Sequence, residues 1–150
     1  MEPALLEALT GWSMFADVLP AGLLWLARQG TVRQLPAGVV VMEKGALSDH
    51  LALVLDGDVE VLLGNGEVAR LGPGQAVGEI GVLTNQPRTA SVRAGAAGCR
   101  LLVLPAAAFD DLVRRSYSFS RSLLSQLAER LMDTTTRKLP SWGDRPEVGR

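Results

Sequence analysis

The sequence has 150 residues, of which 47% are hydrophobic and 21% charged, and its formal net charge is −1 at pH 7. These values exclude disordered and fibrous chains and fit a single soluble globular domain. The balanced charge also disfavours direct binding to nucleic acid, because a phosphate backbone usually selects a strongly basic protein.

The N-terminal third of the chain has the spacing of helices. Apolar residues recur at intervals of three and four between Leu5 and Leu26, and a proline and a glycine suit the two ends of a helix over residues 20–29. Glu7 and Asp17 precede any basic residue, which disfavours a signal peptide, and no apolar run is long enough to cross a membrane. We therefore expect a cytoplasmic protein without membrane contact.

From Thr31 to Leu104 the pattern changes to short apolar runs separated by glycine-bearing turns, which is typical of antiparallel rolls and barrels. Asp56-Gly57 and Asn65-Gly66 are the strongest turn signals, because both pairs tolerate positive φ. Cys99 lies in an apolar run and predicts a buried thiol in a reducing compartment. The candidate strands cover residues 32–35, 39–42, 51–55, 59–63, 68–71, 90–93 and 100–104, with further turns at 36–38 and 72–74.

After Pro105 the helical spacing returns. Residues 106–115 predict a short helix, and Phe119, Leu123, Leu127 and Leu131 form the apolar stripe of a longer helix that should lie with one face on the roll. The fold class is therefore mainly β, an antiparallel roll with N-terminal helices and C-terminal lid helices. We assign residues 1–137 to this domain and 138–150, which lack periodicity, to a flexible tail or linker.

The chemistry is concentrated in residues 78–92. A short helical turn entered through Gly78 offers free backbone N–H groups and a positive dipole end, which favour an anion. Arg88 adds a permanently charged donor fork suited to phosphate, and Thr89 adds a hydroxyl. Glu79 would repel an anion unless it held a donor of its own, such as a sugar hydroxyl. These residues predict a ligand in which a phosphate and a ribose hydroxyl lie close together.

This stretch resembles the phosphate-binding cassette of the cyclic-nucleotide-binding domain family, which includes catabolite activator proteins, protein kinase A regulatory subunits and cyclic-nucleotide-regulated channels. The run from Arg88 to Arg93 is similar to that of hyperpolarisation-gated channels, and Gly45, Asp49 and Gly57 match the family's glycine-flanked hairpins. The resemblance covers most of the chain. It implies a regulatory module without catalytic activity, with cAMP, ahead of cGMP, as the ligand and with no other cofactor or metal.

The resemblance also implies residue roles. Arg88 and the backbone amides of Ile80 and Ala90 would bind the cyclic phosphate, and Glu79 would accept a hydrogen bond from the ribose 2′-hydroxyl. Thr89 would touch phosphate or purine, and the second C-terminal helix would move over the base and transmit the signal to an effector. The glycines of the cassette would let the ligand approach the backbone. The complete set of expected ligand-binding residues is Gly78, Glu79, Ile80, Gly81, Arg88, Thr89, Ala90, Leu127 and Arg130.

Plainer interpretations stay open for these side chains. Arg88 could pair with a surface carboxylate, Glu79 could only stabilise a helix start, and Thr89 could bond locally to the backbone. Leu127 could belong to the core, and Arg130 could be a solvated charge rather than a purine contact.

Other functions remain as alternatives. The chain could be the sensor part of a catabolite-activator-type transcription regulator, although the thirteen tail residues leave no room for a DNA-binding motif unless the sequence is a fragment. It could also be a degenerate domain that binds nothing. A metalloenzyme or phosphodiesterase would need clustered metal ligands, which a sequence with one histidine does not supply. A homodimer through the C-terminal helix is a further option.

Overall fold

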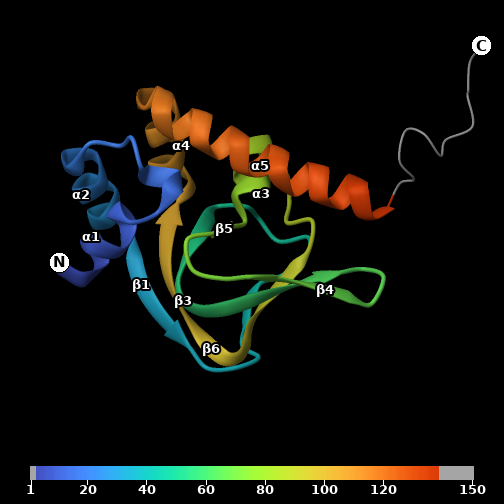
Figure 1. Cartoon of the computed structure of the whole chain (residues 1–150). Coiled ribbons are helices and arrows are strands. Elements are labelled where there is room, and N and C mark those ends of the chain that lie inside the picture. Colours follow the sequence, from blue (N-terminus) through green and yellow to red (C-terminus); the bar gives the residue numbers. More distant parts are fainter. Residues whose placement is uncertain (1–2, 139–150) are drawn as a thin grey trace, which may run out of the picture.

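A computed structural model describes residues 3–138 and shows an antiparallel roll flanked by helices (Figure 1). The sheet order is β1-β6-β3-β4, with β2 on β6 and β5 on β3. This confirms the predicted fold class. The strands are β1 Thr31–Leu35, β2 Val40–Met42, β3 His50–Leu63, β4 Glu67–Leu71, β5 Ala76–Val77 and β6 Ser91–Pro105, and the helices are α1 Pro3–Thr10, η1 Ser13–Phe15, α2 Pro20–Gln29, α3 Glu79–Thr84, α4 Ala106–Arg115 and α5 Tyr117–Lys138.

Two long strands, β3 and β6, form the body of the roll and pair along most of their length. The expected hairpin at Asp56-Gly57 is wrong, because β3 runs through these residues without turning. Gly57 has a φ of 72°, and the register with β6 shifts on both sides of it. It is therefore a β-bulge, in which an extra residue bends the strand instead of reversing it. A Cβ at Gly57 would lie 2.2 Å from the carbonyl oxygen of Gly98, so only glycine fits.

Two predicted helices and one predicted turn agree with the structure. The helices predicted over 20–29 and 106–115 are α2 and α4. The turn at 64–66 joins β3 to β4, with Leu63 paired to Glu67 across it. The candidate strands at 90–93 and 100–104 belong to one strand, β6. Its pairing with β3 is interrupted between them, because the register shifts from Val59–Ala94 to Gly57–Cys99 and leaves residues 95–98 without a partner in β3.

Two apolar clusters fill the molecule. One lies between the helices and the end of the roll, where the ring of Phe119 stacks on Phe15 and meets Phe109 edge to face. The second fills the interior of the roll and includes Met42, and Cys99, which is 5% exposed as predicted. The helices α1, α2, α4 and α5 are thereby fixed to one end of the roll by a shared core.

The long helix α5 lies along the roll beside α3 (Figure 1). Phe119 and Leu123 are buried, and Leu127 packs on the core, but Leu131 is 67% exposed, so the predicted stripe does not extend to it. The core ends one turn before Leu131. Within residues 3–138 no helix is long and apolar enough to cross a membrane. The predicted linker begins with the last residue of α5, and its remainder, residues 139–150, lies outside the described part of the chain.

Candidate functional site

The cassette begins where β5 passes into α3. Gly78 stands between them in the left-handed region, with a φ of 85°, and allows the chain to turn directly from strand into helix. A Cβ on Gly78 would lie 2.7 Å from both Nη1 of Arg88 and the terminal methyl of Met42. The glycine thus permits the turn and also makes space for the arginine.

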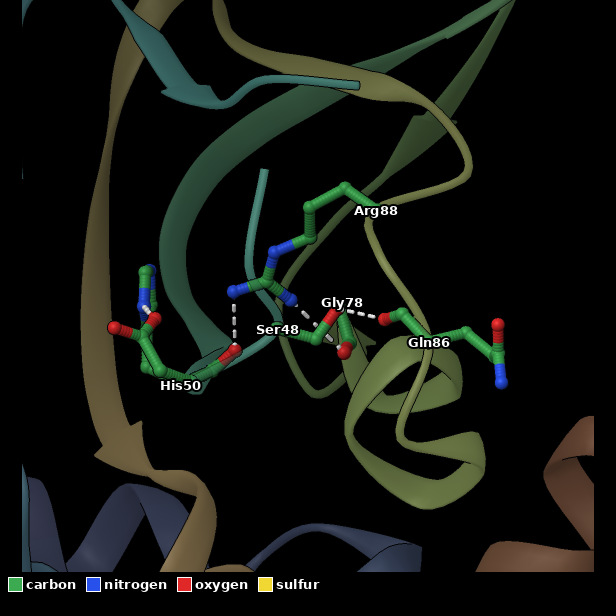
Figure 2. Close-up of polar contacts among 6 residues, drawn as sticks. Ser48, His50, Gly78, Gln86 and Arg88 are labelled. Carbon is green, nitrogen blue, oxygen red and sulfur yellow. Dashed lines mark hydrogen bonds and ion pairs between the residues drawn. The ribbon is translucent and has the colours of Figure 1, made fainter. Parts of the chain in front are cut away.

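Gly81, in the first turn of α3, serves a different purpose. A Cβ on Gly81 would lie 2.1 Å from Oγ of Ser48, whose hydroxyl donates a 2.6 Å hydrogen bond to the carbonyl of Gln86 (Figure 2). The small residue at this position therefore lets the segment before β3 pack closely against α3. Ser48 was missed at the level of sequence because nothing local links it to a segment more than thirty residues away.

Arg88 is a buried charge, 5% exposed, and its guanidinium reaches between two parts of the chain. Nη1 donates to the carbonyl of Gly78 at 3.1 Å, and Nη2 donates to the carbonyl of His50 at 2.5 Å (Figure 2). Burial lowers the pKa of Arg88, and the nearby charge of Asp49 opposes this change. A guanidinium carries five N–H donors, and these two contacts, in the part of the chain described, use two of them. Donors therefore remain for an anion in front of Arg88.

Glu79 is buried as well, at 2% exposure. Its Oε1 accepts a 2.6 Å ion-paired hydrogen bond from Nη1 of Arg130, which comes from α5, and Nη2 of Arg130 donates to the carbonyl of Ala76 at 3.1 Å. Burial raises the pKa of the Glu79 carboxyl, and the Arg130 charge opposes this rise. The structure thus places Arg130 on the carboxylate expected to hold the ribose.

These side chains surround a cavity of about 130 Å³. All the predicted ligand-binding residues line it except Leu127, whose side chain packs on the core beneath the helices. Cavities that take small molecules are usually about 300 to 1,000 Å³, so this cavity is smaller than the usual range. The lining residues are Met42, Val61, Leu71, Ala76, Val77, Gly78, Glu79, Ile80, Gly81, Arg88, Thr89, Ala90, Val92 and Arg130.

The apolar wall opposite the cassette was not predicted as part of the site. Met42, Val61, Leu71 and Val92 come from four different strands and converge on the cavity. Strand alternation predicts which of them face inward, but their meeting at one point depends on how the roll closes. The cavity is therefore lined by both charged and apolar side chains.

A larger cavity, of about 630 Å³, lies between α2 and the junction of α4 and α5. Its charged residues include Arg115, which is paired with Asp111, and it is remote from the cassette. Within the described part of the chain no group of three or more histidine, cysteine or acidic residues is arranged to hold a metal ion. The cassette cavity is lined by the two buried charged residues, Glu79 and Arg88, and is therefore the best candidate site for a charged ligand.

Comparison with known proteins relates the chain to one domain family and to ion channels. The family model of the cyclic nucleotide-binding domain matches residues 32–116. A cyclic nucleotide-gated potassium channel of Mesorhizobium japonicum is 35% identical over 103 residues, which are 69% of this chain and 28% of the channel. The chain spans about a third of the length of the curated channel relatives it matches.

Solved structures share the fold. The catabolite activator protein of Thermus thermophilus is 27% identical, with a TM-score of 0.69 over 83% of this chain and 60% of that protein. A regulatory subunit of a cAMP-independent protein kinase A from Trypanosoma brucei is 20% identical, with a TM-score of 0.76 over 91% of this chain and 49% of that protein, a likeness of fold alone.

Proposed function

The chain belongs to the cyclic nucleotide-binding domain family, and we propose that it binds a cyclic nucleotide, cAMP ahead of cGMP, in the cavity beside α3. The observation that carries this proposal is the pair of buried charges, Arg88 and Glu79, on the wall of one cavity. Buried ionisable groups are costly unless they are paired, and they are often retained at functional sites.

The proposed contacts follow from the chemistry of the lining. Arg88 presents its unused donors to the phosphate, beside the backbone amides at Ile80 and Ala90. Glu79 accepts a hydrogen bond from the ribose 2′-hydroxyl, and Thr89, which is exposed at the cavity edge, reaches phosphate or purine. The apolar wall formed by Val61 and Leu71 suits the purine.

The family provides regulatory modules, and we propose this role for the chain, with a signal carried by movement of α5 to an effector protein or domain. A ligand shifts such an equilibrium only through its different affinity for the two positions of the helix. A cytoplasmic location, the absence of catalysis and of nucleic-acid contact, and a homodimer through α5 are further parts of the proposal. Homologous channels make a membrane-attached full-length protein compatible with it.

A second candidate is a domain that kept the fold and lost the ligand. Two observations favour it: Glu79 is already paired with Arg130, and the cavity is smaller than a nucleotide site. The similar fold of a cAMP-independent kinase subunit supports the same view, because the roll alone does not require cAMP. The sensor of a transcription regulator is a variant of the first proposal, since the roll also resembles that of a catabolite activator protein.

Replacing Arg88 tests the proposal. A charged hydrogen bond contributes roughly 1.5 to 3 kcal/mol, so Arg88→Ala should weaken cAMP binding by about 10- to 100-fold in calorimetry. Because Arg88 also bonds two carbonyls, circular dichroism should establish that the variant is folded. Arg88→Lys keeps a positive charge and should lose less cAMP affinity than Arg88→Ala. Arg70→Ala, which removes an exposed arginine of β4, is the matched control and should bind as wild type does. Equal affinity in wild type and Arg88→Ala would refute the assigned role, and no binding by wild type would favour the second candidate.

A further inference from the structure

We infer that Arg130 is a latch: in the ligand-free protein it holds the second half of α5 against the cassette through Glu79, and the ribose hydroxyl of a bound nucleotide competes for that carboxylate. This inference rests on the proposed function and adds a regulatory element to the same site. It assigns Arg130 a role opposite to a purine contact, because the arginine would oppose binding instead of favouring it.

The Arg130 side chain links α5 to two other elements. Its two terminal nitrogens reach Oε1 of Glu79 and the carbonyl of Ala76, at 2.6 and 3.1 Å, so one side chain joins α5 to both α3 and β5. Glu79 is almost fully enclosed, whereas the Arg130 side chain is 30% exposed. The arginine therefore enters the site from the solvent side and can leave it without disturbing the core.

The energetics favour an exchange of partners over simple release. A buried carboxylate that loses its cation keeps the full cost of desolvation, so Glu79 needs another hydrogen-bond donor when Arg130 leaves. A sugar hydroxyl is such a donor. The carboxyl group that would hold the ribose is already bonded to Arg130 through Oε1, and it lines a cavity that is too small for a nucleotide while Arg130 is in place. Occupancy of the ribose position and closure of the latch therefore oppose each other, and the coupling is reciprocal.

The cavities agree with this assignment. Arg130 lines the 130 Å³ cassette cavity and also a neighbouring cavity of about 520 Å³ that is bordered by Trp12, Gly74 and Gln126. The side chain thus separates a space that is too small for a nucleotide from a larger one beside it. Withdrawal of Arg130 would connect the two and open room for the ligand.

The two halves of α5 are held differently. Phe119 and Leu123 fix the first half in the apolar core. In the second half Leu131 and Met132 are exposed, at 67% and 68%, and the polar contacts described there are those of Arg130. Loss of these contacts should therefore loosen residues 128–138 while the first half of the helix stays in place.

Arg130→Gln tests the latch, with Arg121→Gln, an exposed arginine of the same helix, as the matched control. Without nucleotide, amide hydrogen exchange in residues 128–138 should be several-fold faster in Arg130→Gln and unchanged in Arg121→Gln, while residues 117–124 keep their protection. In calorimetry Arg130→Gln should bind cAMP roughly 3- to 30-fold more tightly than wild type. The gain should be smaller for 2′-deoxy-cAMP, which has no hydroxyl to compete for Glu79.

Weaker or equal cAMP binding by Arg130→Gln would overturn the latch, and so would unchanged exchange in the second half of α5. An equal gain for cAMP and 2′-deoxy-cAMP would overturn competition at Glu79. If neither wild type nor Arg130→Gln binds a nucleotide, the proposed function fails and competition fails with it. The exchange measurement then decides separately whether Arg130 holds the helix.

Discussion

Two buried charges of opposite sign lie in one short segment, and they are stabilised in different ways. Arg88 is held by main-chain carbonyls, which belong to the fold and stay in place. Glu79 is held by the side chain of a different element, which can move away. At the scale of single residues, Arg88 is therefore held in place by the fold, and in the proposed site it is the anchor for the ligand while Glu79 is the group that changes its partner.

Cys99 provides a test of the core at the same scale. It is 5% exposed, and burial, together with the nearby charge of Asp58, raises the pKa of its thiol. Because the thiolate is the reactive form, alkylation by iodoacetamide at pH 8 should be at least about tenfold slower in the native protein than in the urea-unfolded protein. Mass spectrometry over time gives both rates, and equal rates would contradict the burial of Cys99 in the roll.

At the scale of elements, β3 depends on the bulge at Gly57. An alanine there would require a positive φ and would place its Cβ against the backbone oxygen of Gly98. We expect Gly57→Ala to lower the free energy of unfolding by about 2 to 4 kcal/mol in urea titrations.

Gly64 supplies the control, because nothing lies within 4 Å of the position a Cβ would take and its φ is not in the left-handed region. Gly64→Ala should change the unfolding free energy by less than about 0.5 kcal/mol. If the two alanine variants were equally stable, Gly57 would not be the tight bulge described.

Local sequence patterns predicted most helices, strands and turns. They failed where the local structure depends on pairing with a strand that is distant in the sequence. The turn at 64–66 and the bulge at Gly57 carry the same local signal, a glycine beside Asn or Asp, and both accept positive φ. Only the position of Gly98 on the opposite strand distinguishes them. Leu131 illustrates a similar limit, because its helical spacing continues a stripe beyond the end of the core that the stripe covers.

The candidate site was predictable in part for the same reason. The predicted residues at 78–81 and 88–90 lie in one continuous segment, so their chemistry could be seen in the sequence, and they do line one cavity. Arg130 is 51 residues from Glu79, and no local pattern connects them. Whether they meet depends on how α5 packs on the roll, and that packing is set by Phe119 and Leu123, which are remote from the site.

At the scale of the whole molecule, we propose that the roll and the partly anchored α5 form the two parts of a switch. The apolar core fixes the helical end of the roll and the start of α5, and the ion pair at Arg130 connects the far half of α5 to the cassette. The matches to the channel relatives cover 69% to 82% of this chain and 28% to 32% of those proteins. Under the proposed function, the effector would therefore be sought next to this domain or on a partner.

The most direct test of the nucleotide site is an NMR titration of the ¹⁵N-labelled protein with cAMP, with 5′-AMP as the control for a phosphate that is not cyclic. We predict saturable shifts that are largest at the amides of residues 78–81 and 88–90, smaller with 5′-AMP, and lost in Arg88→Ala at the same concentrations. No saturable shift with cAMP, or shifts confined to the cavity between α2 and the α4–α5 junction, would contradict the assignment of the cassette as the binding site.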